Sequence, residues 1–240
     1  MNPAPKMNAK NISQTLRSLG DPDIAEHSKR FFKTGEGEYG AGDRFLGIRV
    51  PVLRKQVAKF REAPLQEVEK LLHSSYHEER LFALFLMVVK YERSNAAEKE
   101  AVYDCYMANT AYINNWDLVD SSAPYIVGEY LIARDKAVLY TFAQSESLWE
   151  RRIAIMATFY FIRNSRFDTA LAIAELLLSD THDLIHKAVG WMLREVGNRE
   201  PDRERAFLAS RYKSMPRTML RYAIEKFPEG ERKAYLKGEV

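Results

Sequence analysis

The sequence predicts an all-α chain folded as a curved solenoid of short helical hairpins. Apolar residues follow helical spacing almost throughout, and alternating strand patterns bounded by Asn-Gly or Asp-Gly turns are absent. A charged or polar anchor also recurs ahead of apolar helices, at steps of 37, 35, 35 and 30 residues. The anchors are Arg80, Trp116-Asp117, Arg152, Lys187 and Arg217. With two helices per unit, these steps indicate short and irregular HEAT-like repeats, and a plain helical bundle is the alternative.

Several helix starts are legible in the sequence. Asp21 precedes Pro22 as a capping carboxylate, and Ser147 and Glu150 have the spacing of a capping box. The run Leu81–Val89 is too long and too uniformly apolar for a half-exposed strand, and it predicts a buried helix. Five further prolines suit the first turn of a helix: Pro51, Pro64, Pro124, Pro201 and Pro216.

Composition is that of a globular protein. The 240 residues are 46% hydrophobic and 29% charged, which excludes a wholly disordered chain. We expect one domain over residues 1–240, with residues 1–10 as a flexible N-terminus. No stretch is apolar enough to span a membrane, the polar start suggests no secretory signal, and Cys105 is expected to be an inert packed thiol. These features predict an intracellular protein that needs no membrane, metal or organic cofactor.

The basic residues are unevenly distributed. The net charge is +3 overall, but residues 149–240 carry 17 basic and 13 acidic side chains. Between Arg205 and Lys226 six basic residues face one acidic residue, Glu225. Such a stretch suits a polyanion, because each neutralised phosphate releases counterions. A solvated helix face is the alternative.

Two motifs invite a different interpretation and are set aside. Residues 35–40 match the G-x-G-x-x-G fingerprint, but a helical basic segment precedes them where a strand is needed, so we interpret them as a flexible connection between helices. His73 with His77, and His182 with His186, would each share one helix face. Neither pair has the H-E-x-x-H order, and we expect structural or surface histidines.

The segment Asn115–Pro124 is the most unusual of the chain. Trp116 and Asp120 are four residues apart, so on a helix they share one face. Arg152 and Trp191, the latter with Arg194 nearby, would lie on equivalent faces of later repeats and could converge on one groove. The alternative is that the tryptophans fill the core while Asp120 and Arg152 form an ion pair between repeats. Spacing leaves both interpretations open.

Three segments resemble the AlkD family of DNA glycosylases. They are Trp-Asp-x-Val-Asp-Ser at 116–121, Trp-x-x-Arg-x-Ala-Ile at 149–155 and Lys-Ala-x-Gly-Trp-x-Leu-Arg-Glu at 187–195. Residues 45–51 (Phe-Leu-Gly-Ile-Arg-Val-Pro) are similar to the family as well. The resemblance therefore extends from about residue 45 to 195, in the family's order and with similar gaps. It implies HEAT-like repeats and hydrolytic removal of N3- and N7-alkylated purines, such as 3-methyladenine and 7-methylguanine, from double-stranded DNA in base excision repair.

The resemblance also implies roles for individual residues. It places the catalytic aspartate at Asp120, the aromatic neighbours at Trp116 and Trp191, and a supporting arginine at Arg152. Charge and repeat position suggest further DNA-binding residues: Lys187, Arg194, Arg217 and Arg221. Two departures from the family are Phe31, where the family can have a tyrosine, and the longer connection Gly35–Gly42. Both bear on the range of lesions accepted.

The expected chemistry needs few groups. An N3- or N7-alkylated purine is cationic and departs as a neutral base, so no general acid is needed, unlike ordinary glycoside hydrolysis. One ionised carboxylate can stabilise the sugar cation and orient the attacking water. Two other functions remain open at this point. They are a catalytically inactive DNA-binding relative and a protein-binding HEAT scaffold, for which a neutral or acidic concave face is expected.

Overall fold

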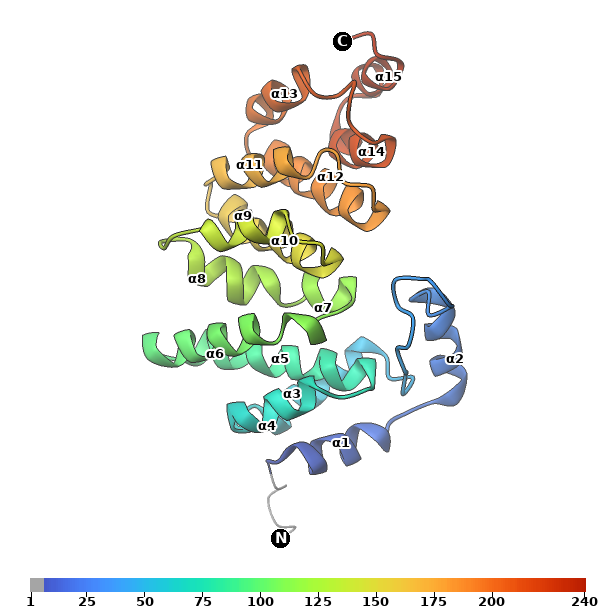
Figure 1. The fold of residues 1–240 in the computed structure, drawn as a ribbon, viewed down its shortest axis with the longest axis vertical. Coiled ribbons are helices and arrows are strands. Elements are labelled where there is room, and N and C mark those ends of the chain that lie inside the picture. Colours follow the sequence, from blue (N-terminus) through green and yellow to red (C-terminus); the bar gives the residue numbers. More distant parts are fainter. Residues whose placement is uncertain (1–6) are drawn as a thin grey trace. The chain divides into compact units, whose positions relative to one another are not determined.

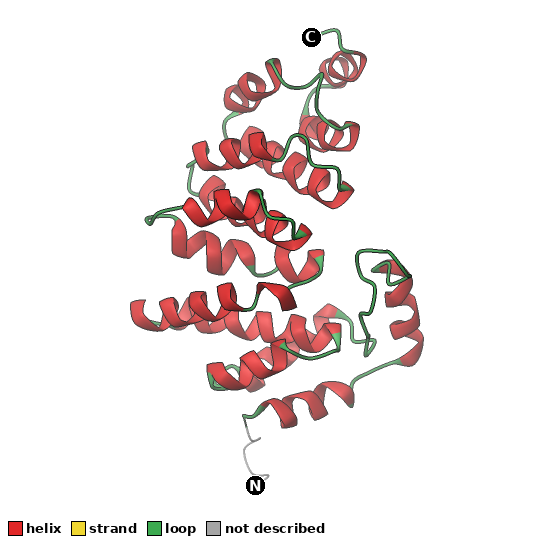
Figure 2. Ribbon diagram, viewed as in Figure 1, coloured by secondary structure: helices red, strands yellow, loops and turns green. Residues whose placement is uncertain are grey.

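The computed structural model of the chain describes residues 7–240. Helices dominate, and within these residues no strand forms beyond an isolated bridge between Arg44 and Tyr76 (Figure 2). The chain divides after Ser122 into two compact units. The predicted all-α, helical-repeat fold class is confirmed. No helix within residues 7–240 is long and apolar enough to cross a membrane.

The first unit is arranged around a buried central helix, α5. Its elements are α1 (Ala9–Arg17), α2 (Pro22–Phe31), α3 (Val50–Phe60), α4 (Leu65–Leu72), α5 (His77–Arg93), α6 (Ala96–Ala108), the 3₁₀ turn η1 (Thr110–Tyr112) and α7 (Trp116–Asp120). The helices α3, α4, α6 and α7 all pack on α5 (Figure 1). The predicted helix at Leu81–Val89 belongs to α5, and its residues as far as Met87 are buried. This helix supplies the core against which the short α7 is held.

The second unit consists of stacked helix pairs. Its elements are the π-helical turn η2 (Pro124–Gly128), α8 (Glu129–Leu131), α9 (Ala137–Ala143), α10 (Leu148–Arg163), α11 (Asp168–Leu176), α12 (Asp183–Gly197), α13 (Pro201–Ala209), α14 (Arg217–Ala223), the 3₁₀ turn η3 (Ile224–Lys226) and α15 (Glu229–Lys237). Along one row η2 packs on α10, α10 on α12 and α12 on α14. The helices α9, α11 and α13 pack on α10 and α12 as a second row (Figure 1).

A recurring hydrogen-bonded corner begins three of the long helices. The side chain of the corner residue accepts a bond from the backbone N–H two residues later, at 2.8–3.1 Å. Its carbonyl accepts a bond from the side chain six residues later, at 2.5–3.1 Å. The corner residues are Ser74, Ser145 and Asp180, and the donors are Arg80, Arg151 and His186. The repeat is therefore real. The predicted anchors Arg152 and Lys187 nevertheless stand one residue after the true equivalents, Arg151 and His186, because sequence spacing does not tell which of two adjacent polar residues reaches the corner carbonyl.

Most expected helix starts are confirmed. Asp21 caps α2 by accepting from the N–H groups of Asp23 and Ile24, and Ser147 caps α10 by accepting from the N–H of Glu150. Two predictions need correction, because Pro64 and Pro216 are the N-cap residues of α4 and α14 rather than members of the first turn. A proline is tolerated there because the N-cap N–H lies outside the helix.

The predicted flexible N-terminus, residues 1–10, agrees only in part with the structure. Residues 1–6 of the N-terminus predicted to be flexible lie outside the described residues, whereas Ala9 and Lys10 already belong to α1. In α1 the side chain of Asn8 accepts from the N–H of Asn11, and the N–H of Ala9 donates to Glu67, which ties this end to α4. A single functional domain over residues 1–240 stays a prediction.

Candidate active site

The short helix α7 carries two of the predicted site residues, Trp116 and Asp120. It begins where the buried side chain of Asn115 accepts a hydrogen bond from the N–H of Trp116 at 2.8 Å. Trp116 is its first residue and Asp120 its last, so they lie one helical turn apart on one side. Both side chains are half-buried. Asp120 as a residue is therefore neither sealed in the core nor fully exposed.

Aromatic rings surround Trp116. The ring of Phe32 stacks on it with centroids 5.5 Å apart and planes inclined by 23°. The ring of Phe31 meets it edge-on at 6.0 Å, and Phe31 is itself 58% exposed. That Phe31 takes the place of a family tyrosine stays a prediction, and the structure shows an exposed phenyl ring beside Trp116. This leaves an apolar edge next to the predicted site.

The glycine-rich stretch 35–42 connects α2 to α3, as predicted, and no strand precedes it. Gly37 and Gly42 adopt left-handed φ angles with open space around them. The segment after the connection is anchored firmly, because the N–H groups of Leu46, Gly47 and Ile48 all donate to the Glu78 carboxylate at 2.8–3.2 Å. The rejected nucleotide motif is thus a connection whose far end is anchored to α5.

Asp120 lies near a buried phenol. The hydroxyl of Tyr106 is 3.1 Å from that of Ser122, and the Tyr106 ring is buried. Burial, together with the negative charge of Asp120, raises the pKa of Tyr106, so its hydroxyl remains protonated. In the same helix, burial raises the pKa of Cys105 to about 11, which fits the expected inert thiol.

A buried polar network beneath Trp116 was not predicted. The His77 ring is held between two carboxylates, with Nε2 2.8 Å from Asp117 Oδ2 and Nδ1 3.2 Å from Asp43 Oδ2. Arg80 donates to the other oxygen of Asp43 at 2.5 Å, and the Asn115 side-chain amide donates to Asp43 at 3.3 Å. His77 and Arg80 are no more than 4% exposed. The sequence signal for this network is His77-Glu78-Glu79-Arg80, four polar residues directly before an apolar run.

The predicted pairing of histidines on helix faces is wrong for His73 and His77. His73 is the C-cap of α4 and His77 the first residue of α5, so a corner separates them. His73 Nε2 lies 2.5 Å from Asn109 Oδ1. His182 is the N-cap of α12 and accepts from the N–H of Leu184, while His186 donates to the corner carbonyl of Asp180. These four histidines have structural roles.

Arg152 and Trp191 lie in the second unit, on the packed helices α10 and α12. Arg152 is 4% exposed and donates through Nη1 to the carbonyl of Leu184 at 2.5 Å. Trp191 is half-buried, its Nε1–H donates to Glu195 at 3.2 Å, and its ring lies 6.0 Å from that of Phe159. A phosphate contact by Arg152 stays a prediction.

The four predicted DNA-binding residues differ in their surroundings. Lys187 forms an ion pair with Asp183 at 2.7 Å, and Arg194 forms one with Glu225. Arg217 and Arg221 lie four residues apart on α14, and both are exposed. Of the four, these two arginines therefore display their charge most openly.

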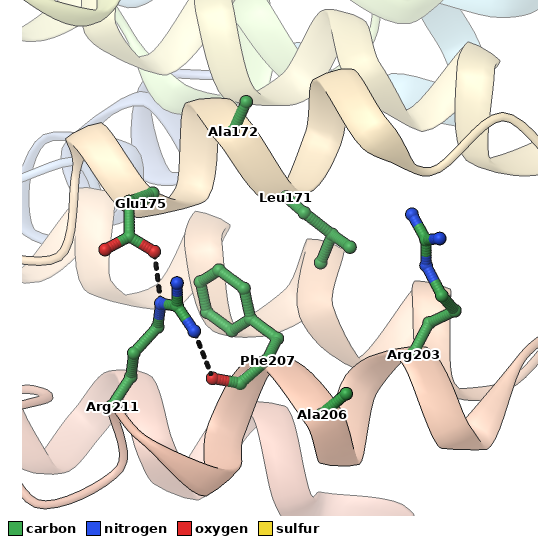
Figure 3. A pocket seen from close by; sticks show the side chains of 7 residues that line it. All are labelled: Leu171, Ala172, Glu175, Arg203, Ala206, Phe207 and Arg211. Atoms are coloured by element: carbon green, nitrogen blue, oxygen red, sulfur yellow. Dashed lines mark hydrogen bonds and ion pairs between the residues drawn. The ribbon is translucent and has the colours of Figure 1, made fainter.

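A hollow of about 480 Å³ lies elsewhere, between α11 and α13 (Figure 3). Arg203 and Arg211 stand at its two ends, with Leu171, Ala206 and Phe207 between them. Arg211 pairs with Glu175, and Arg203 pairs with Asp168. The hollow contains none of the predicted site residues.

Comparison with known proteins gives a consistent result. The chain is similar to a protein from Enterococcus faecalis described as a predicted DNA alkylation repair enzyme, with a TM-score of 0.70 and 17% identity over 88% of this chain and 98% of that one. It is also similar to AlkD2 from Streptococcus mutans, with a TM-score of 0.55 and 14% identity over 86% and 98% of the two chains. A search of curated proteins finds no match. Residues 12–227 match the sequence profile of the family described as DNA alkylation repair enzyme, and the chain therefore belongs to that family.

Proposed function

We propose that this chain is a monofunctional DNA glycosylase, a cytoplasmic monomer that hydrolyses the N-glycosidic bond of cationic N3- and N7-alkylated purines in double-stranded DNA. The proposal rests on its membership of the DNA alkylation repair enzyme family and on the match of Trp116, Asp120, Arg152 and Trp191 to the AlkD pattern. The observation that carries it is the half-buried pair of Trp116 and Asp120 on one side of α7. A carboxylate sealed in the core could not reach a deoxyribose.

Asp120 is assigned the chemical step. As the purine leaves as a neutral base, positive charge develops on the sugar, and a carboxylate near that sugar lowers the barrier electrostatically. The same carboxylate orients a water molecule for attack on the sugar carbon. No proton needs to be delivered to the leaving base, because alkylation has already made it cationic.

The aromatic and basic residues bind and position the substrate. The rings of Trp116 and Trp191 can present their faces to the cationic nucleotide, which contributes roughly 0.5–2 kcal/mol each. Exposed Arg217 and Arg221 supply charge for backbone phosphates. Arg152, held by the Leu184 carbonyl, is assigned a supporting role in placing the lesion. Selectivity then follows from the ease with which the damaged base departs.

The test measures binding and turnover separately. The full chain is first titrated with a plain duplex across a salt series, and then incubated with methylated DNA, with release of 7-methylguanine and alkali-labile abasic sites as readouts. Binding with release supports the proposal. Binding without release indicates an inactive DNA-binding relative, and absence of binding indicates a protein-binding scaffold. Either of these results, or release of uracil at a rate comparable to that of 7-methylguanine, overturns it.

A further inference from the structure

The buried His77 connects three segments of the first unit. His77 is the first residue of α5. The two carboxylates that contact its ring come from the segment before α3 (Asp43) and from α7 (Asp117). The backbone N–H of His77 donates to the carbonyl of Arg44 at 2.8 Å, which ties the start of α5 to the segment that carries Asp43. Asp117 is the residue directly after Trp116. A displacement of the His77 ring therefore acts on α7 at its first turn.

A second connection runs through aromatic rings. The His77 ring lies 4.7 Å from that of Phe32 and stacks on Phe45 at 4.9 Å. Phe32 in turn stacks on Trp116 at 5.5 Å. Trp116 is thus connected to His77 both through the backbone of Asp117 and through the ring of Phe32. These are independent contacts, and both converge on one indole.

The charges around His77 nearly balance. Asp43 and Asp117 face the ring from their two segments, and Arg80 on α5 pairs with Asp43. Phe32 and Phe45 bring no charge, and Glu78 directs its carboxylate at the backbone amides of residues 46–48. With a protonated ring, two positive groups match two carboxylates. With a neutral ring, the two carboxylates share one guanidinium, and one buried negative charge lacks compensation.

Hydrogen bonding also favours a protonated His77 ring. A neutral imidazole has one N–H and can donate to one carboxylate, whereas the imidazolium donates to both. Asp117 depends on the ring most strongly, because its Oδ1 is buried without a hydrogen-bond partner among the described residues. Asp43 keeps Arg80 and Asn115 in either state. Loss of the ring proton leaves one N–H for the two carboxylates and removes the positive charge that strengthens the bond to Asp117, so it weakens the attachment of α7.

We propose that His77 is a positioning residue, which as an imidazolium holds Asp117 and Phe32 so that Trp116 and Asp120 of α7 keep the geometry needed to act on a damaged nucleotide. This inference rests on the proposed function, because it takes Trp116 and Asp120 to be the site. It assigns His77 no proton transfer and no contact with DNA. Its effect on the reaction passes through α7.

The titration of His77 supports the geometry. Burial alone lowers the pKa of the imidazole, but the charges and hydrogen bonds of Asp117 and Asp43 outweigh it and raise the pKa to about 9. Burial also acts to raise the pKa of Asp43, yet its contacts with His77 and Arg80 hold it below the ordinary value. The ring is therefore protonated at neutral pH and loses its proton only in alkaline solution.

The first experiment needs no catalytic turnover. Trp149 and Trp191 are replaced by phenylalanine, so that Trp116 is the one remaining tryptophan, and its fluorescence is followed from pH 7 to pH 10. We expect a transition with a midpoint near pH 9. It should persist in His27→Gln, which changes an exposed histidine of α2, and vanish in His77→Gln. An identical transition in His77→Gln overturns the inference.

A second variant guards against misfolding of His77→Gln. Asp117→Asn keeps the shape of the side chain and removes the charge that raises the pKa of His77. The midpoint of the Trp116 transition should then move to lower pH, and an unmoved midpoint overturns the inference. This readout is independent of glycosylase chemistry. If the midpoint shifts but the parent chain releases no base, the proposed function is refuted, whereas the contact by which His77 holds α7 is still shown.

The kinetic experiment uses the chain with all its tryptophans. We expect His77→Gln to lower kcat for 7-methylguanine release by at least tenfold with little change in KM for DNA, because α7 is misplaced while the phosphate contacts remain. His27→Gln should leave both constants unchanged. In the parent, kcat should fall with the same midpoint as the fluorescence transition. A normal kcat in His77→Gln, or a rise in KM alone, would refute the positioning role.

Discussion

Arg80 and Arg151 occupy the same place in two repeats. Each donates through Nη1 to the carbonyl of the serine six residues before it, at 3.1 and 2.9 Å. That serine in turn donates its hydroxyl to a glutamate, Glu79 or Glu150, at 2.5 Å. The repeat thus resides in the corner that starts a helix as well as in the apolar faces behind it. Arg152, the residue after Arg151, donates to the Leu184 carbonyl of α12.

Asp120→Asn should lower the rate of 7-methylguanine release by about 100-fold or more, because a neutral amide cannot stabilise the sugar cation. Binding of plain duplex should persist, since the phosphate contacts are unchanged. The matched control is Asp104→Asn, which makes the same change at an exposed position of α6. Base release is measured by chromatography under single-turnover conditions. Unchanged turnover in Asp120→Asn would remove the role assigned to this carboxylate.

Replacing both Arg217 and Arg221 by alanine should flatten the salt dependence of duplex binding. If each arginine neutralises one phosphate, the slope of log K against log salt falls by about 0.9 per residue, or about 1.8 in total. The double alanine variant of Arg203 and Arg211 removes the same charge from arginines already paired with Asp168 and Glu175. Its slope should match that of the parent. Equal slopes in all three proteins would show that α14 does not touch the backbone.

Gly190→Ala should destabilise the protein by about 1–3 kcal/mol, the usual range for overpacking. A Cβ there would lie 2.4 Å from the Met219 carbonyl oxygen and 2.5 Å from the Cβ of Tyr222, so α12 and α14 would have to separate. In Gly230→Ala the new methyl group meets nothing within 4 Å, and the variant should be at least as stable as the parent. Urea unfolding measures both. A Gly190→Ala protein as stable as the parent would contradict the close approach of these helices.

Glu204 should make the folded protein less stable as pH rises. Burial is the main cause that raises its pKa to about 8, from an ordinary value of 4.5. The folded chain therefore keeps a proton that the unfolded chain loses, and this contribution to stability declines as pH rises from 4.5 to 8. The decline is at most about 1.4 kcal/mol per pH unit.

The test of Glu204 compares Glu204→Gln with the exposed control Glu200→Gln in urea at pH 5, 6.5 and 8. The free energy of unfolding of Glu204→Gln, relative to that of the parent, should increase at each step to higher pH, because glutamine does not titrate. Glu200→Gln should follow the parent throughout. Parallel pH profiles for all three proteins would show that Glu204 titrates normally.

Local patterns sufficed for much of the fold. The caps at Asp21 and Ser147, the buried helix after Arg80 and the shared face of Trp116 and Asp120 depend only on residues close together in the sequence, and the sequence predicts each of them. Such features are set by backbone hydrogen bonding and side-chain spacing, which a single sequence displays directly.

The His77 network could not be predicted in this way. Asp43, His77 and Asp117 are far apart in the sequence and meet only because the Asp43 segment and α7 both reach His77 at the start of α5. The same limit explains the error at His73 and His77, because the corner at Ser74 divides what reads as one helical face. Long-range ion pairs depend on the fold, and no local pattern encodes their partners.

The glycine-rich connection has a practical consequence. One end is closed by the bond from the Gly40 N–H to the Lys33 carbonyl at 3.1 Å, and beyond it the Glu78 carboxylate fastens residues 46–48. Within the turn that the first bond closes, a side chain added at Gly37 would meet nothing within 4 Å. The tip of this connection is a suitable place to graft a fluorescent dye or an affinity peptide. A label on Gly37 would leave the Gly40–Lys33 bond and the bonds of residues 46–48 in place.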